Sequence, residues 1–293
     1  MEPPKPDYAA YFRFSQRPFS LTPDPRFYFR SRSHARVFDA LSAAIARRDC
    51  LMLLLGDLGV GKTTLCRTLL DTQERKSRAA LAGNALLSPD DLLRLMLQDL
   101  GALPKDEIAL ARLQLASHGE LVDTFNDFLG RMRASGEGAV MIVDEAHSLP
   151  PATREQVVEI ACLDSNRDRV VQFLLAGQPS AVGGAMFPAL GDERLGVRAR
   201  LQPLERDECA PYIAHRLAIG GGHAVTFSSA AIEVIYRLSG GVPRLVNLLC
   251  ERGLQEAADA KASQVEPEMI ESAASALDLI RLRPKRFRWY GTR

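Results

Sequence analysis

The sequence has 293 residues, and its 37 lysines and arginines nearly balance its 36 aspartates and glutamates, for a net charge of +1. Hydrophobic residues make up 46% and charged residues 25% of the chain. This composition is ordinary for a globular protein and excludes a largely disordered one. The length allows one large domain or two smaller ones, each with a real core.

The first segment, residues 1–36, is rich in proline and aromatic residues. Pro18, Pro23 and Pro25 prevent a regular helix here. Aromatic side chains recur between Tyr11 and Phe29, and they need an apolar surface to pack against. We therefore expect a strap that lies on the domain that follows it.

Residues 37–204 alternate short apolar runs with stretches of helical periodicity. Wholly apolar runs of this length are typical of strands buried on both faces of a parallel sheet. The expected strands are Leu51–Leu55, Arg78–Ala82, Ala139–Val143 and Val170–Ala176. The expected helices are Ser33–Arg48, one from Lys62, Leu92–Leu100 and Leu121–Arg133. The alternation predicts an α/β fold, with helices on both sides of an open parallel sheet.

Residues 205–283 have a different pattern, with three or four helical stretches and no convincing strand. We expect a small all-helical domain there, followed by a basic tail at 284–293. The five cysteines are far apart and form no CxxC pair, so neither a disulfide framework nor a zinc site is expected.

Two further features bear on location. The longest strong apolar run, Leu51–Leu55, is much shorter than the ~20 residues that cross a bilayer. The first six residues lack the apolar segment of a signal peptide. We therefore expect a cytoplasmic protein.

The segment Gly56–Thr63 matches the phosphate-loop pattern GxxxxGK[ST] in full, between a predicted strand and a predicted helix. Glycines let the backbone N–H groups turn inward around a phosphate, and the helix N-terminus adds partial positive charge. Lys62 can reach the β- and γ-phosphates, and the Thr63 hydroxyl can ligate Mg²⁺. The residues expected to bind the nucleotide are Gly56, Asp57, Gly59, Val60, Gly61, Lys62, Thr63 and Thr64.

An apolar run, Val140–Val143, ends in the acids Asp144 and Glu145. The carboxyl ends of parallel strands open on one crevice, so these acids should face the phosphate loop. We expect Asp144 to hold Mg²⁺, directly or through water, and Glu145 to polarise the attacking water. The four residues from Asp144 to His147 spell the DEAH motif of some helicases. However, fewer than 150 residues follow, too few for a second motor domain.

Three other polar features could sense the γ-phosphate. Gln178 follows a predicted strand and would either orient the attacking water or cap a turn. The arginines of segment 194–200 are either solvated surface or a source of charge for a neighbouring subunit's nucleotide. Arg244 opens a helix in the small domain and could reach back to the nucleotide.

Together these residues resemble AAA+ ATPases of the ExeA or general secretion pathway protein A group, which includes MshM-like pilus proteins. The related TnsC/TniB transposition ATPases share the core. The segments that carry the resemblance are Arg17–Pro25, Gly56–Thr64, Asp144–His147, Gly177–Pro179 and Tyr236–Arg244.

The resemblance implies ATP and Mg²⁺ as cofactors and assigns site roles. It makes Lys62 and Thr63 Walker A residues, and Asp144 and Glu145 Walker B residues. It also makes Gln178 sensor 1, Arg244 sensor 2, and Arg194 the first choice for an arginine finger, with Arg198 second. It places Phe19–Pro25 near adenine.

The resemblance also implies a function: ATP hydrolysis in a ring or filament that assembles or remodels a bacterial secretion or type IV pilus complex. A DNA-binding transposition regulator and a nucleotide-gated scaffold with slow hydrolysis remain alternatives. The resemblance to ExeA implies a longer protein, in which a transmembrane helix and a peptidoglycan-binding domain follow the ATPase. This sequence stops where that helix would start. A peripheral place at the inner membrane would therefore come through a separate partner.

The near-neutral total charge is unevenly distributed. Residues 281–293 contain six basic and no acidic side chains, together with Phe287, Trp289 and Tyr290. This basic tail is either a solvated end or a contact for DNA, an anionic membrane surface or an acidic partner.

Overall fold

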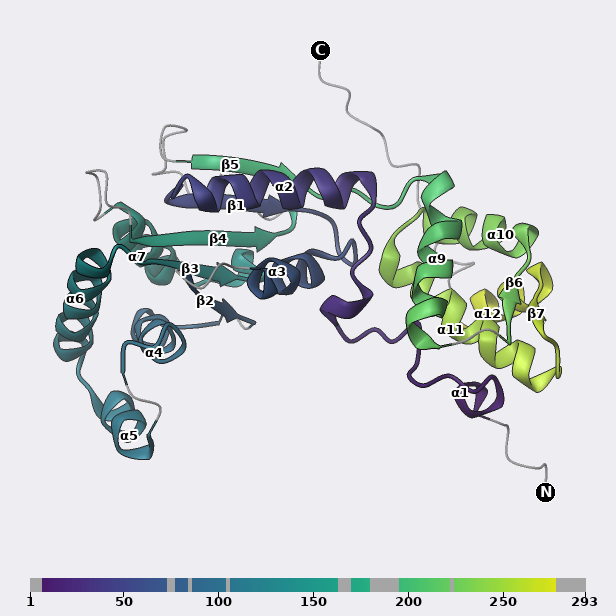
Figure 1. The fold of residues 1–293 in the computed structure, drawn as a ribbon, viewed down its shortest axis with the longest axis horizontal. Helices are drawn as coiled ribbons and strands as arrows, with labels where there is room; N and C mark the ends of the chain where they lie inside the picture. The colour runs from purple at the N-terminus through teal and green to yellow at the C-terminus, as the bar shows by residue number, and fades with distance from the viewer. Residues whose placement is uncertain are drawn as a thin grey trace, which may run out of the picture. The chain divides into compact units, whose positions relative to one another are not determined.

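The computed structural model describes residues 7–72, 77–83, 86–103, 106–162, 170–179, 195–221 and 224–277. The chain forms two compact units, each with its own hydrophobic core (Figure 1). The core unit is Arg30–Gln202. The composite unit combines Met1–Phe29 with Pro203–Arg293. Among the described residues, no helix has the length and apolar character needed to span a bilayer.

A parallel sheet forms the centre of the core unit. Its strands are β1 (Leu51–Leu55), β2 (Ser77–Ala82), β3 (Gly138–Val143), β4 (Val171–Gly177) and β5 (Leu195–Arg200). In the described part of the unit they lie in the order β2-β3-β4-β1-β5, and every pairing is parallel. β1, β3 and β4 are therefore interior strands, which explains why their residues are apolar on both faces.

Helices cover both faces of this sheet. They are α2 (Arg32–Ala46), α3 (Lys62–Asp71), α4 (Pro89–Asp99), α5 (Glu107–Leu115), α6 (His118–Ser135) and α7 (Pro151–Cys162). Alternate strand residues such as Leu53, Met141 and Phe173 pack into one apolar cluster with side chains of α4, α6 and α7. The intervening residues point to the opposite face, and α2 runs along β5 and contacts α3. The layered α/β fold expected from the sequence is confirmed.

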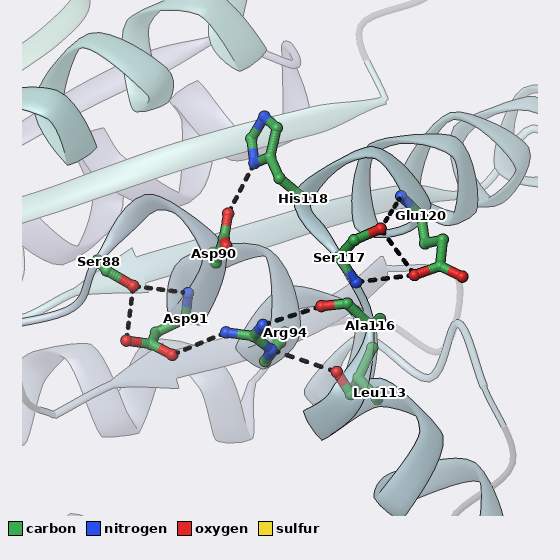
Figure 2. Close-up of polar contacts among 9 residues, drawn as sticks. All are labelled: Ser88, Asp90, Asp91, Arg94, Leu113, Ala116, Ser117, His118 and Glu120. Carbon is green, nitrogen blue, oxygen red and sulfur yellow. Dashed lines mark hydrogen bonds and ion pairs between the residues drawn. The ribbon is translucent and has the colours of Figure 1, made fainter.

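A polar network joins α4, α5 and α6 (Figure 2). Arg94 of α4 donates hydrogen bonds to the carbonyls of Leu113 at 3.2 Å and Ala116 at 3.1 Å, at the end of α5. Nδ1 of His118, at the start of α6, lies 2.6 Å from a carboxylate oxygen of Asp90 in α4. The last carbonyls of a helix lack partners within the helix, so Arg94 supplies the C-terminal cap that α5 itself does not encode.

The composite unit is mainly helical in its described residues. Its elements are α1 (Tyr8–Tyr11), η1 (Pro25–Phe27), α9 (Arg206–Gly220), β6 (Thr226–Phe227), α10 (Ser229–Ser239), α11 (Pro243–Asp259), β7 (Gln264–Val265) and α12 (Pro267–Ala276). The expected helical stretches are therefore present. The two-residue strands β6 and β7 pair in parallel, a detail that the expectation of an all-helical domain missed because such a short pairing leaves no periodic signal.

The N-terminal segment packs on the C-terminal helices, a correction to the strap expected on the following domain. Tyr8, Phe12 and Phe19 are buried in the apolar cluster of the composite unit. The guanidinium of Arg216 in α9 holds the segment's backbone, because it donates to the Pro18 carbonyl at 2.6 Å. The aromatic residues thus complete the core of a unit whose other part begins at Pro203, far along the sequence.

Strand β5 was also missed. The sequence suggested an exposed arginine-rich segment, yet Leu195, Val197 and Ala199 alternate with Gly196 and with residues 198 and 200 in the period of a strand. The arginines are exposed and the intervening side chains are less so. A half-exposed edge strand keeps charged residues on its solvent side, and these concealed the apolar alternation.

Candidate functional site

The phosphate loop connects β1 to α3 in the core unit, as the sequence predicted. Gly59 and Gly61 have φ angles of +81° and +102°, which L-residues with side chains adopt at a cost. Gly56 is needed for space, because a Cβ atom there would lie 2.8 Å from Val60 Cγ2 and 3.2 Å from the carbonyl oxygen of Leu201. The glycines therefore make the tight loop possible.

Lys62 begins α3 and is 4% exposed. Its Nζ donates hydrogen bonds to the loop's own carbonyls, at 3.0 Å to Gly56 and 3.2 Å to Asp57. The ammonium group is thus held inside the curve of the loop. A negatively charged phosphate there would be a stronger acceptor than a neutral carbonyl.

A direct contact joins the loop helix to the end of β3. The Thr63 hydroxyl donates a hydrogen bond to a carboxylate oxygen of Asp144. The other carboxylate oxygen accepts the backbone N–H of Glu145 at 2.9 Å. Hydroxyl and carboxylate oxygens are the ligands that Mg²⁺ prefers, so this pair fits the metal that the sequence implies.

The residue that follows, Glu145, has a left-handed backbone with φ of +50°. This conformation is costly for a residue with a side chain, at about 1–3 kcal/mol, and it turns the chain sharply after β3. One Glu145 carboxylate oxygen lies 3.4 Å from Nδ1 of His147. This distance places the half-buried His147 beside the acid pair.

Gln178 follows β4 directly, and β4 lies between β3 and β1. Val143 pairs with Leu175, and Leu55 pairs with Gly177. The half-buried Gln178 therefore lies at the same end of the sheet as Asp144 and the phosphate loop, where the strands have their carboxyl ends. The expectation that its strand lies beside the Asp144 strand is confirmed.

The arginines predicted for the site fall in three different places. Arg194 lies outside the described residues. Arg198 is exposed in β5, with its Cα paired with that of Leu53 in β1. Arg244 is the exposed second residue of α11 in the composite unit. Phe19, which begins the segment that the resemblance places near adenine, is fully buried in the composite unit.

A buried thiol in the helix after the loop and a buried imidazole against the loop were not singled out from the sequence. Burial and the nearby Asp144 carboxylate raise the pKa of the Cys66 thiol in α3, so Cys66 stays protonated and serves as an apolar filler. His34 of α2 lies with Nε2 3.0 Å from the Val60 carbonyl oxygen. No sequence motif links His34 to the loop, because it lies on an earlier helix.

Comparison with known protein families gives a match to an AAA domain over residues 46–183. General secretion pathway protein A of Aeromonas hydrophila is 32% identical over 249 residues, which cover 84% of this chain and 44% of that protein. Holliday junction branch migration complex subunit RuvB of Chlorobium limicola is 25% identical, over 85% of this chain and 64% of that protein. The chain thus spans less than two thirds of either relative.

Solved structures support the fold. The Aeropyrum pernix ORC2 protein superposes with a TM-score of 0.67 at 16% identity, covering 90% of this chain and 72% of that one. The Thermotoga maritima RuvB branch migration motor gives a TM-score of 0.52 at 18% identity, covering 84% of this chain and 67% of that one.

Proposed function

We propose that this chain, which belongs to the AAA+ ATPase family, binds ATP at Gly56–Thr64 and hydrolyses it to ADP and phosphate with Mg²⁺. The observation that carries the proposal is the contact of Thr63 with Asp144. This contact joins the phosphate loop to the acids that follow strand β3. The groups proposed to bind phosphate and metal therefore lie together at the carboxyl ends of the strands.

Each residue of the site has a separate task in this reaction. Lys62 would exchange its carbonyl partners for the β- and γ-phosphates, while the loop N–H groups hold the phosphate oxygens. Thr63 and Asp144 would hold Mg²⁺, which when bound neutralises charge on the phosphates. Glu145 would accept a proton from the attacking water, and Gln178 would orient that water or contact the γ-phosphate.

Two substitutions separate binding from hydrolysis. Lys62→Ala should abolish ATP binding measured by calorimetry, and unchanged affinity would reject the phosphate-loop assignment. Glu145→Gln should keep ATP bound but stop its turnover, because an amide cannot take the proton. Glu155→Gln, at an exposed acid of α7, is the matched control and should turn over ATP normally. Normal turnover in Glu145→Gln would remove its role.

We also propose that the active form is a ring or filament in which an arginine completes a neighbour's site. Arg194 is the first candidate and Arg198 the second, and Arg244 would act as sensor 2. Arg194→Ala should lower turnover while sparing ATP binding. Mixing Arg194→Ala with Glu145→Gln protein should restore some activity at composite interfaces. If mixtures at every ratio stay inactive, the assignment of a finger acting on a neighbour loses its support.

The proposed biological role is assembly or remodelling of a bacterial secretion or type IV pilus complex. The similarity to General secretion pathway protein A supports it. Such a role predicts that components of that machinery are retained by the Glu145→Gln protein with ATP but not with ADP. A peripheral place at the inner membrane would then come from that partner.

A second candidate is an ATP-regulated DNA-binding protein, as in transposition. It is favoured by the similarity to RuvB, whose name places it at Holliday junctions, and by the six basic residues of segment 281–293. ATP turnover with and without duplex DNA at several salt concentrations tests it, because phosphate contacts make DNA binding steeply salt-dependent. A nucleotide-gated scaffold, the third candidate, would release less than one phosphate per bound ATP over the assay.

A further inference from the structure

His34 lies beneath the phosphate loop, although it is about 25 residues earlier in the sequence. It is the third residue of α2 and is 5% exposed. Its Nε2 atom is 3.0 Å from the carbonyl oxygen of Val60, inside the loop. Its Nδ1 atom is 2.7 Å from the hydroxyl of Ser31. Both ring nitrogens are therefore engaged, one of them by the loop backbone.

The chemistry of the two partners assigns the ring protons. A carbonyl oxygen can only accept a hydrogen bond, so Nε2 carries a proton and donates a hydrogen bond to the Val60 carbonyl. The neutral ring then has a lone pair on Nδ1, and the Ser31 hydroxyl donates to it. The same hydroxyl oxygen accepts the backbone N–H of His34 at 3.3 Å, which caps α2. Ser31 thus fixes both the helix start and the tautomer.

Holding the Val60 carbonyl also aims the next amide. The peptide bond between Val60 and Gly61 is trans, and in a trans peptide the C=O and N–H groups point in opposite directions. With its oxygen on the His34 ring, this peptide directs the Gly61 N–H away from the ring. The loop N–H groups that face away from the supporting side chains are those that can cradle a phosphate.

The close packing at this point resists rotation of the peptide. A Cβ atom at Gly61 would lie 3.1 Å from Nε2 of His34, so the ring touches the loop with no room for a water molecule. Gly61 has φ of +102°, a conformation in which a glycine can rotate between alternatives at low cost. A fixed donor on one side of the peptide would remove that freedom.

We propose that His34 is a positioning residue for the phosphate loop: it donates to the Val60 carbonyl and thereby orients the Gly61 N–H toward bound phosphate. This rests on the proposed function, because it deepens the same nucleotide site. His34 meets the loop at the Val60 carbonyl oxygen, so its effect acts through the loop backbone.

A pair of variants isolates the hydrogen bond. His34→Gln places an amide N–H close to where Nε2 lies, whereas His34→Leu fills similar space without a donor. We expect His34→Leu to bind ATP and ADP about tenfold more weakly, the value of one well-placed hydrogen bond. His34→Gln should stay within about threefold of the wild type on the same scale. Equal affinity of His34→Leu and wild type, or equal loss in both variants, would overturn the inference.

Hydrogen exchange in the nucleotide-free protein provides a readout that does not depend on ATP. Amide exchange in a peptide covering residues 56–63 should be faster in His34→Leu than in wild type and close to wild type in His34→Gln. Exchange in β3, whose neighbours in the sheet are β2 and β4, should be alike in all three. If wild type fails to bind ATP, the proposed function fails. If loop exchange is the same in all three proteins, the inference about His34 fails.

Discussion

Two adjacent glycines between α10 and α11 provide a sharp test of the packing in the composite unit. Gly240 and Gly241 have φ angles of +59° and +75°, so alanine at either position pays a similar backbone cost of about 1–2 kcal/mol. Their surroundings differ. A Cβ atom at Gly240 meets nothing within 4 Å, whereas at Gly241 it would lie 2.1 Å from the carbonyl oxygen of Leu204.

This difference sets the expected magnitudes. Gly240→Ala should lower the free energy of unfolding by about 1 kcal/mol, because reduced freedom of the unfolded chain offsets part of the strain. Gly241→Ala must also displace backbone, which costs about 1–3 kcal/mol. It further weakens the hydrogen bond that Leu204 N–H donates to the Gly241 carbonyl at 2.9 Å, worth about 1 kcal/mol. We expect a total loss of about 3–5 kcal/mol on these terms.

Hydrogen exchange is the appropriate assay, since the chain has two units and global unfolding need not be two-state. Peptides from α10 and α11 should exchange much faster in Gly241→Ala than in Gly240→Ala, and peptides from β1 and β3 should be unaffected. Nearly equal losses of exchange protection in the two variants would show that the close approach to Leu204 does not affect stability. That result would refute the reasoning.

Three further predictions concern stability. Gly130→Ala, within α6 where a Cβ meets nothing within 4 Å, should raise the free energy of unfolding by about 0.5–1 kcal/mol in urea denaturation; a loss would mean that the helix is strained there. Arg216→Met should release the N-terminal segment to limited proteolysis, since the carbonyls of Pro18 and Ser20 lose their donor, whereas protection equal to wild type would contradict this. Burial, with the charge of Arg216, lowers the pKa of His215. The unfolded chain then binds more protons, so stability should decline as pH falls below about 6.5, less steeply in His215→Phe; parallel pH profiles of the unfolding midpoint would reject this.

The phosphate loop and the acid pair were predictable because their chemistry is local. The glycines, Lys62 and Thr63 all lie within the segment Gly56–Thr63. Asp144 is marked by the apolar strand before it. In the structure, Thr63 contacts Asp144, and Gln178 lies at the same end of the sheet, where the strands have their carboxyl ends. That convergence follows from the rule that parallel strands end on one side of the sheet.

Strand β5 could not be predicted in this way. An edge strand has one neighbouring strand and a solvent-facing side, so Arg198 interrupts the apolar pattern that marks an interior strand such as β4. Helices α5 and α7 were missed because neither has a strong apolar periodicity. The C-terminal end of α5 is capped by Arg94, a residue of another helix, and its own sequence has little apolar periodicity.

By itself, the sequence determined the class of fold, the phosphate loop and the acid-ended strand, because each depends on residues close together in the chain. The tertiary structure alone decided where residues 7–29 pack and how the loop is supported. Tyr8 and Phe19 pack against helices that begin after residue 205, and His34 reaches Val60 from another element. Burial of an apolar ring and a hydrogen bond to a distant carbonyl leave no motif of fixed spacing in the sequence. Only the folded chain therefore shows which residues form these contacts.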